Sequence, residues 1–444
     1  MDFMSLLLAP SEWPTSGPWE SVIKWFSDGV GGKIAIAIIL LTICLKLVML
    51  PLDFWQRYNT RKMTQAQVLM KDELDAIKSK YQDQNVVNQK TMELYKKHNF
   101  KPTSGCLPML VYMIVTWVVF FTLFSALGNI SRTKINYEYA QLQETYVAAY
   151  QPTYDAKYQE IVDAGVYPTE DYGTLEEYAD AEAQKEALKV SQHEVVVKYD
   201  QIRQGFLSIK TLWRPDNWSS VFPNYSEFIN NTGTQFKLAS VKDADNNIVN
   251  KYVVKLSSGD GEIKPYISLD GKIYVTDATV ASLEIKGVVY DQSQFAVVTP
   301  EGEQTIEQAT GIAAKKAFKA DFETITNGIN NKYKGTWNGY LGLIVLTAVI
   351  TFLSQFLSSL GIKTRDKKGN QISGVKPNPV MGIVLAGIMI FFTISYTSMF
   401  ALYIMTSNIL SVGFSICINL VLNKIESVKL KKQNDKITPD YVRK

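Results

Sequence analysis

The 444-residue sequence lacks the motifs of most catalytic and ATP-driven proteins. It contains no P-loop, G-x-G-x-x-G, H-E-x-x-H or G-x-S-x-G, which argues against nucleotide-driven pumps, dinucleotide enzymes, zinc proteases and serine hydrolases. Only two histidines occur, and no cluster of His, Cys, Asp or Glu has metal-ligand spacing. We therefore expect the protein not to be an enzyme, and we expect neither a metal nor a cofactor.

Cysteine is also scarce. The three cysteines, Cys44, Cys106 and Cys417, all lie in or at the mouth of long apolar runs, so no disulfide framework is expected. The first ten residues, MDFMSLLLAP, carry no basic residue and only a short apolar run. We therefore expect no cleaved signal peptide.

Long apolar runs, in contrast, are abundant. About twenty helical residues cross a bilayer, and five runs reach that length. They predict a first transmembrane helix at 33–55, a second at 106–127, a third at 338–360, and a fourth and fifth within 380–423. The expected fold is an all-α polytopic membrane protein with one large insert outside the membrane.

The charge of the connecting segments alternates in sign. Residues 56–105, 361–379 and 424–444 carry net charges of +5, +4 and +4, whereas residues 1–32 and 128–339 carry −3 and −8. Lys and Arg in short loops mark the cytoplasmic side of a membrane. We therefore expect a multi-pass protein of the bacterial cell (plasma) membrane, with its N-terminus outside and its C-terminus in the cytoplasm.

The segments outside the predicted spans differ in composition and in expected secondary structure. Residues 1–32 predict an extracytoplasmic amphipathic segment, and residues 56–105 predict a cytoplasmic helical hairpin with thin apolar stripes. Residues 128–232, rich in tyrosine, predict a helical stalk, and the short β-branched runs of 233–305 predict a small antiparallel β domain. Residues 306–337 predict a helical return to the third span. Residues 361–379 and 424–444 form a basic cytoplasmic loop and a basic tail.

Lys46 interrupts the first apolar run. A cation there costs about 2.5–3.5 kcal/mol on insertion scales. Its ammonium could snorkel toward the cytoplasmic interface, since Asp53 follows seven residues later. The alternative is a hydrated cavity, open to the cytoplasm, that stabilises the cation without a paired carboxylate.

The other polar residues that we single out in the predicted spans carry hydroxyl or amide groups and no charge. Their hydroxyls and amides could join helices to one another, for about 0.6–2 kcal/mol each, or line a groove that they share with Lys46. The groove residues that we predict are Lys46, Thr42, Tyr112, Thr116, Thr351, Gln355, Tyr403 and Ser407.

Several motifs resemble the YidC-type membrane protein insertases. KLVMLPLDFWQRYNTRKM (46–63) is similar to the first core span of that family and its exit, and Gly105–Pro108 to the start of the second. FALYIMTSN (400–408) resembles the opening of the last span, and GFLSIKTLWRPDN (205–217) the element before the third.

The resemblance implies an insertase that receives hydrophobic segments of nascent membrane proteins in a hydrophilic groove open to the cytoplasm. It releases them sideways into lipid. The family usually has an arginine at the position of Lys46. The lysine keeps the positive charge but lacks the fork of donors that arginine has. The family's proline-glycine turn before the last span is replaced by Ser395–Ser398, and its tryptophan after the tyrosine by Ile404.

The implied partners are nascent membrane-protein substrates and membrane lipids. The ribosome and a Sec-type translocon stay open, as does the ligand of the β insert. Contact of the basic tail with ribosomal RNA, through Lys429, Lys431 and Lys432, competes with an ordinary cytoplasmic tail. Two rival functions also stay open: a membrane-anchored extracytoplasmic binding or adhesion protein, and a channel or transporter.

Overall fold

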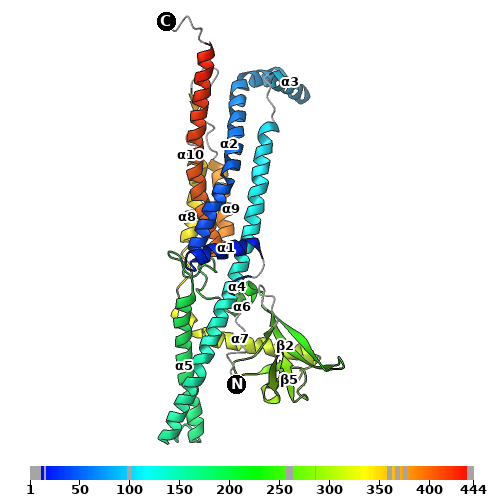
Figure 1. Ribbon diagram of the computed structural model, residues 1–444, viewed down its shortest axis with the longest axis vertical. Coiled ribbons are helices and arrows are strands. Elements are labelled where there is room, and N and C mark those ends of the chain that lie inside the picture. The colour runs from blue at the N-terminus through cyan, green and yellow to red at the C-terminus, as the bar shows by residue number, and fades with distance from the viewer. Residues whose placement is uncertain are drawn as a thin grey trace. The chain divides into compact units, whose positions relative to one another are not determined.

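The computed structural model describes residues 12–14, 17–97, 103–256, 264–285, 287–357, 363–365, 371–373 and 379–437 (Figure 1). The predicted N-terminal segment, hairpin exit, basic loop and tail therefore lie partly outside the described residues. The chain divides into two compact units. One comprises residues 1–24 and 126–340, and the other residues 25–125 and 341–444.

The second of these units, the helical unit, contains the apolar helices. It is built from α2 (Ile34–Lys80), α3 (Gln84–Lys97), the first part of α4 (Thr103–Ala164), α8 (Gly342–Leu357), α9 (Pro379–Ser395) and α10 (Ser398–Ile437), with a two-stranded sheet of β8 (Lys363–Arg365) and β9 (Gln371–Ser373). Helix α2 packs against α10, and α8 packs against both α9 and α10 (Figure 1).

Three helices of the described chain are long and apolar enough to cross a membrane: Ile34–Ala66, Leu107–Ala164 and Ser398–Val428. Two shorter apolar helices, Gly342–Ser354 and Ala386–Ser395, lie in the third and fourth predicted spans. The prediction of a mostly helical protein with several apolar helices and a small sheet is confirmed.

Aromatic rings join α4 to the start of α10 within the helical unit. The ring centroid of Phe400 lies 5.6 Å from that of Phe120 and 4.9 Å from that of Phe124. The ring centroid of Tyr396, just before α10, lies 4.0 Å from that of Phe124, with the two rings tilted at 54°. Such pairs add roughly 0.5–1.5 kcal/mol each beyond the area that they bury.

The other unit, the insert unit, contains α1 (Pro18–Gly29, in part), the rest of α4, α5 (Leu175–Ile202), α6 (Tyr225–Thr232) and α7 (Ile306–Lys332). Helix α5 buries a stripe of small residues at four-residue spacing, Ala179, Ala183, Ala187 and Ser191. Small side chains let helices approach closely, and a Cβ on Gly328 of α7 would lie 2.7 Å from the carbonyl oxygen of Gln192. The α5–α7 contact therefore depends on glycine at position 328.

Tyrosines form a stack along the C-terminal half of α4. Tyr146, Tyr150, Tyr154 and Tyr158 follow one another at four-residue spacing, with interplanar angles of 19°, 11° and 21°. Residues four apart share a face of a helix, which is why these rings meet. The Tyr154 hydroxyl donates to Asp180 of α5 at 2.6 Å, so the stack also links the two helices.

The β part of the insert unit is a sheet with the order β1-β2-β4-β7, and β3 pairs with β2. The strands are β1 (Gln235–Lys242), β2 (Ile248–Leu256), β3 (Lys264–Pro265), β4 (Ile273–Val275) and β7 (Phe295–Val297), and β5 (Ser282–Ile285) and β6 (Val288–Asp291) form a separate hairpin. Tyr252, Ile273, Val275, Leu283 and Tyr290 contribute to one apolar core beneath both. The pairing is antiparallel except between β4 and β7, which run parallel.

The segment 205–217 is fixed by one buried asparagine. The side-chain amide of Asn338 donates to the carbonyl oxygens of Arg214 and Pro215 at 3.2 and 2.9 Å, and its oxygen accepts from the backbone N–H of Thr211 at 2.8 Å. A Cβ on the next residue, Gly339, would fall 1.8 Å from a carboxylate oxygen of Asp216. Only glycine therefore allows this close approach.

A buried carboxyl holds the same segment against α4. The indole N–H of Trp213 donates to Glu138 Oε1 at 2.5 Å, and the Ser131 hydroxyl donates to the Trp213 carbonyl at 2.8 Å. Burial raises the pKa of Glu138 to about 8, although the Trp213 hydrogen bond and the nearby Lys134 act in the opposite direction. Glu138 is therefore mostly protonated at neutral pH.

Candidate substrate groove

Lys46 lies on the face of α2 that packs against α10. Its ammonium donates a hydrogen bond to Ser411 Oγ at 2.7 Å, and the Ser411 hydroxyl donates to the Ser407 carbonyl at 2.8 Å. Among the described residues, no carboxylate lies within 4 Å of this ammonium. The lysine therefore has a neutral hydroxyl, and no carboxylate, as its direct partner within the described residues.

Two predicted groove threonines are buried and differ in their contacts. Thr42 donates to the Ile38 carbonyl of its own helix at 2.6 Å. Thr351 on α8 donates within its helix to Thr347 at 2.7 Å and accepts a hydrogen bond from the Asn408 amide of α10, also at 2.7 Å. Thr351 therefore joins two helices, whereas the hydrogen bond of Thr42 stays within α2.

Four other predicted groove residues form two pairs along their helices. Tyr112 and Thr116 lie one turn apart on α4, and Tyr403 and Ser407 one turn apart on α10, all half-buried. The hydrogen bond of Lys46 goes to none of these four side chains. Four further predicted residues belong to described helices, but their side chains lie outside the description: Gln355, Lys429, Lys431 and Lys432.

Two arginines that the sequence analysis did not single out continue the contact between α2 and α10. Arg57 donates through Nη1 to Ser415 Oγ and through Nε to Asp53 Oδ1, both at 2.8 Å. One turn further, the buried Arg61 donates to the amide oxygens of Asn419 and Asn423, each at 2.8 Å.

These contacts form a single row, which we call the α2–α10 polar row: Lys46, Arg57 and Arg61 on α2 with Ser411, Ser415, Asn419 and Asn423 on α10. The α10 members recur every four residues, so they lie along one ridge of that helix. The usable signal in the sequence was this spacing within an otherwise apolar helix. Within this row Lys46 is bonded to a neutral hydroxyl, whereas Arg57 and Arg61 also have carboxylates nearby, Asp53 at 2.8 Å and Glu426 at 3.9 Å. Lys46 is therefore the member of the row best placed to attract an anionic group.

A known protein family matches the first part of the chain. Residues 25–162 match the model of the family described as 60Kd inner membrane protein. This segment of the chain therefore resembles that family. The predicted resemblance to this family is confirmed, and the matched segment contains α2, with Lys46, Arg57 and Arg61.

Curated relatives of the chain are named membrane protein insertase YidC. The chain is 38% identical over 102 residues to one from Fusobacterium nucleatum, which is 23% of this chain and 48% of the relative. It is 31% identical over 113 residues to one from Staphylococcus carnosus, covering 23% of this chain and 39% of the relative. A YidC 2 of Listeria innocua is 37% identical over 97 residues, 22% of this chain and 34% of the relative.

The chain thus spans less than half the length of these YidC relatives. The motifs at 205–217 and 400–408 lie outside the family match, so their resemblance stays a prediction. No solved structure matches the chain.

Proposed function

We propose that the protein is a membrane protein insertase. It receives hydrophobic segments of nascent membrane proteins in a hydrophilic groove, open to the cytoplasm and containing Lys46, and releases them laterally into lipid. Five spans would carry the N-terminus and the insert unit outside and the C-terminus inside. The first two of these spans lie in the segment that matches the 60Kd inner membrane protein family.

The observation that carries the proposal is the hydrogen bond between Lys46 and Ser411. A cation inside an apolar helix is costly, and a carboxylate partner would neutralise it. A hydroxyl partner leaves its charge available to an acidic residue in the hydrophilic tail of a substrate. That attraction lowers the cost of moving the tail past apolar lipid, because a charge without a partner is expensive in a low dielectric.

Site-specific crosslinking to a ribosome-stalled nascent chain tests the proposal. A photoreactive residue at position 46, and a second at Gln355, should capture a hydrophobic nascent segment. Position 44 is the matched control, since Cys44 is exposed on the same helix and two residues away. Capture of lipid alone from positions 46 and 355 would contradict the proposal and favour an anchored binding protein or a channel.

A further inference from the structure

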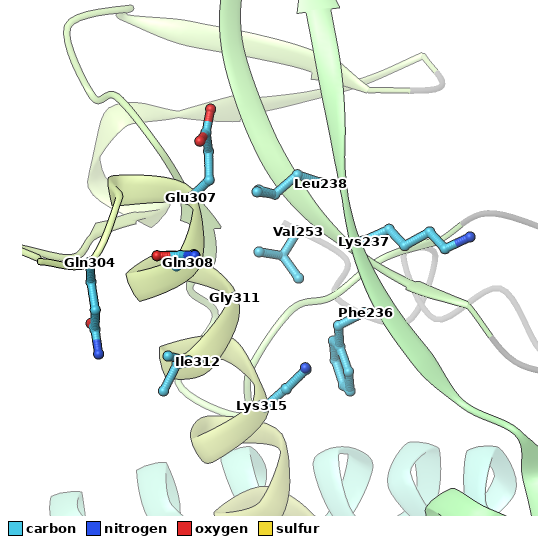
Figure 2. A pocket seen from close by; sticks show the side chains of 10 residues that line it. All are labelled: Phe236, Lys237, Leu238, Val253, Gln304, Glu307, Gln308, Gly311, Ile312 and Lys315. Atoms are coloured by element: carbon cyan, nitrogen blue, oxygen red, sulfur yellow. The ribbon is translucent and has the colours of Figure 1, made fainter.

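The insert unit contains a cleft of about 390 Å³ between its sheet and the first turns of α7 (Figure 2). Leu238 of β1 and Val253 of β2 point into the cleft from the sheet, and Gln308 lines it from α7. A Cβ on Gly311 would meet no atom within 4 Å, so the helix side of the cleft is open at this position. The volume lies within the range of small binding sites.

Strand β1 stands at the edge of the sheet, with β2 as its neighbour among the described strands. The carbonyl oxygens of Lys251 and Val253 on β2 accept hydrogen bonds from the β3–β4 side of the sheet, at 2.9 and 3.2 Å. These residues therefore turn their peptide groups away from β1. Their partners across the ladder are Ser240 and Leu238.

In an antiparallel pair, such residues direct their own N–H and C=O groups to the outer side. The free edge of β1 therefore presents the backbone donors and acceptors of Leu238 and Ser240. Leu238 is also the residue whose side chain enters the cleft. The outward-facing backbone groups of β1 and the cleft are therefore next to each other, at the same part of the strand.

The charged side chains of β1 itself are all positive. Strand β1 carries Lys237 and Lys242 and no acidic residue. Lys237 points away from the cleft, and the ammonium of Lys315 on α7 points toward Phe236 (Figure 2). The one acidic side chain lining the cleft, Glu307, is paired with Lys251 at 2.7 Å. An acidic partner would therefore meet exposed lysines on both faces of the strand.

We propose that the free edge of β1 and the adjacent cleft bind an extended, acidic polypeptide segment, which adds to the sheet as a further strand. Successive side chains of an added strand alternate between the faces, and the strand lies about 4.8 Å from β1. One face then places apolar side chains beside Leu238, over the cleft. The other places carboxylates beside Lys237. That the natural occupant is the translocated tail of a substrate rests on the proposed function.

Peptide binding to the full chain in detergent tests the proposal. The probe is a fluorescent ten-residue peptide of alternating valine and glutamate. Two derivatives are N-methylated at every second residue, in opposite phases. Since only one phase directs its N–H groups at β1, one derivative should bind about tenfold more weakly or worse, and the other should bind like the parent.

Protein variants test the charge and the cleft. Lys237→Glu should weaken binding about fivefold, and the matched Lys334→Glu, an exposed lysine beyond the end of α7, should leave it unchanged. A peptide with lysine in place of glutamate should bind at least about fivefold more weakly than the parent. Equal binding of both N-methylated peptides would overturn the proposal. So would crosslinking of a photoreactive residue at position 238 to a second copy of the chain instead of to the peptide.

The two proposals can fail separately. Peptide binding is measured without insertion, so it can persist when photoreactive residues at positions 46 and 355 capture lipid alone. In that case the insertase proposal fails and the peptide site stands. If Lys46 variants lose insertion while no peptide binds, the insertase proposal stands and the strand-addition site is wrong.

Discussion

The guanidinium of Arg61 donates from Nη2 to the side-chain oxygen of Asn419 at 2.8 Å, although the two residues are 358 positions apart in the sequence. Arg61 is only 8% exposed, and Nη1 reaches Asn423 at the same distance. This fork fastens α2 to α10 one turn beyond the contact of Arg57. Glu426 of α10 lies 3.9 Å from Nη1, so the buried charge has a carboxylate nearby as well as two amide oxygens.

Arg61→Ala should destabilise the helical unit by about 2–4 kcal/mol, since it removes the donors to two amide oxygens and leaves a cavity. The measurement is thermal unfolding of the protein in detergent. Lys62→Ala is the matched control, because Lys62 is the next residue and is exposed. Equal loss of stability in both variants would show that the fork contributes nothing specific.

Lys46→Glu should abolish, and Lys46→Gln should weaken, insertion of substrates with acidic tails, because the groove loses or reverses its charge. Lys46→Arg should retain insertion of these substrates, since arginine keeps the positive charge and adds donors that can still reach Ser411. The assay is complementation of cells depleted of their own insertase, with the level of each variant checked in membranes. Full growth with Lys46→Glu would sink the proposed role of the charge.

Glu138 should make the stability of the insert unit depend on pH. Its pKa is raised to about 8 in the folded protein from an ordinary value of 4.5. The folded state therefore holds a proton that the unfolded state loses between these values. The contribution of Glu138 to the free energy of unfolding should be greatest below about pH 4.5. It should fall by about 1.4 kcal/mol per pH unit up to about pH 8.

Glu138→Gln should flatten that slope, because glutamine keeps an acceptor for Trp213 without a titrating proton. Glu194→Gln, an exposed glutamate on α5, should retain the wild-type slope. The measurement is chemical unfolding at a series of pH values. A slope that survives in the Glu138→Gln protein would assign the pH dependence to another group.

Gly328→Ala should destabilise the α5–α7 contact by about 1–3 kcal/mol, because the new methyl group would overlap the Gln192 carbonyl oxygen. The matched substitution on the same helix, Gly311→Ala, meets open space and should stabilise by about 0.5–1 kcal/mol through helix propensity. Thermal unfolding of both proteins tests the pair. Stabilisation by both substitutions would mean that α5 moves aside readily.

The helices could be predicted because their apolar runs are long, and Lys46 because a cation is rare inside such a run. Arg57 and Arg61 carry the same charge but follow the apolar run, where basic residues are expected on the cytoplasmic side, so nothing marked them. Their partners Ser415 and Asn419 lie more than 350 positions away, and a pattern within one helix does not reveal which helix it faces.

The β domain shows the same limit. Alternation and turn residues predicted its strands, and adjacent strands such as β1 and β2 pair as hairpins do. The parallel pairing of β4 with β7 joins segments separated by another hairpin, so it depends on how the core closes around Ile273 and Phe295. Local sequence contains no measure of that closure.

The four-residue repeat of the α2–α10 polar row has one more consequence. Sliding α10 along α2 by one turn, about 5.4 Å, would bring a hydroxyl or an amide opposite each cation again: Lys46 would meet Ser407 or Ser415, and Arg57 would meet Ser411 or Asn419. Neighbouring registers of α10 along α2 therefore offer nearly equivalent hydrogen-bond partners. The hydrogen bonds of the row hold the two helices together, while the choice among neighbouring positions falls to the apolar side chains around them.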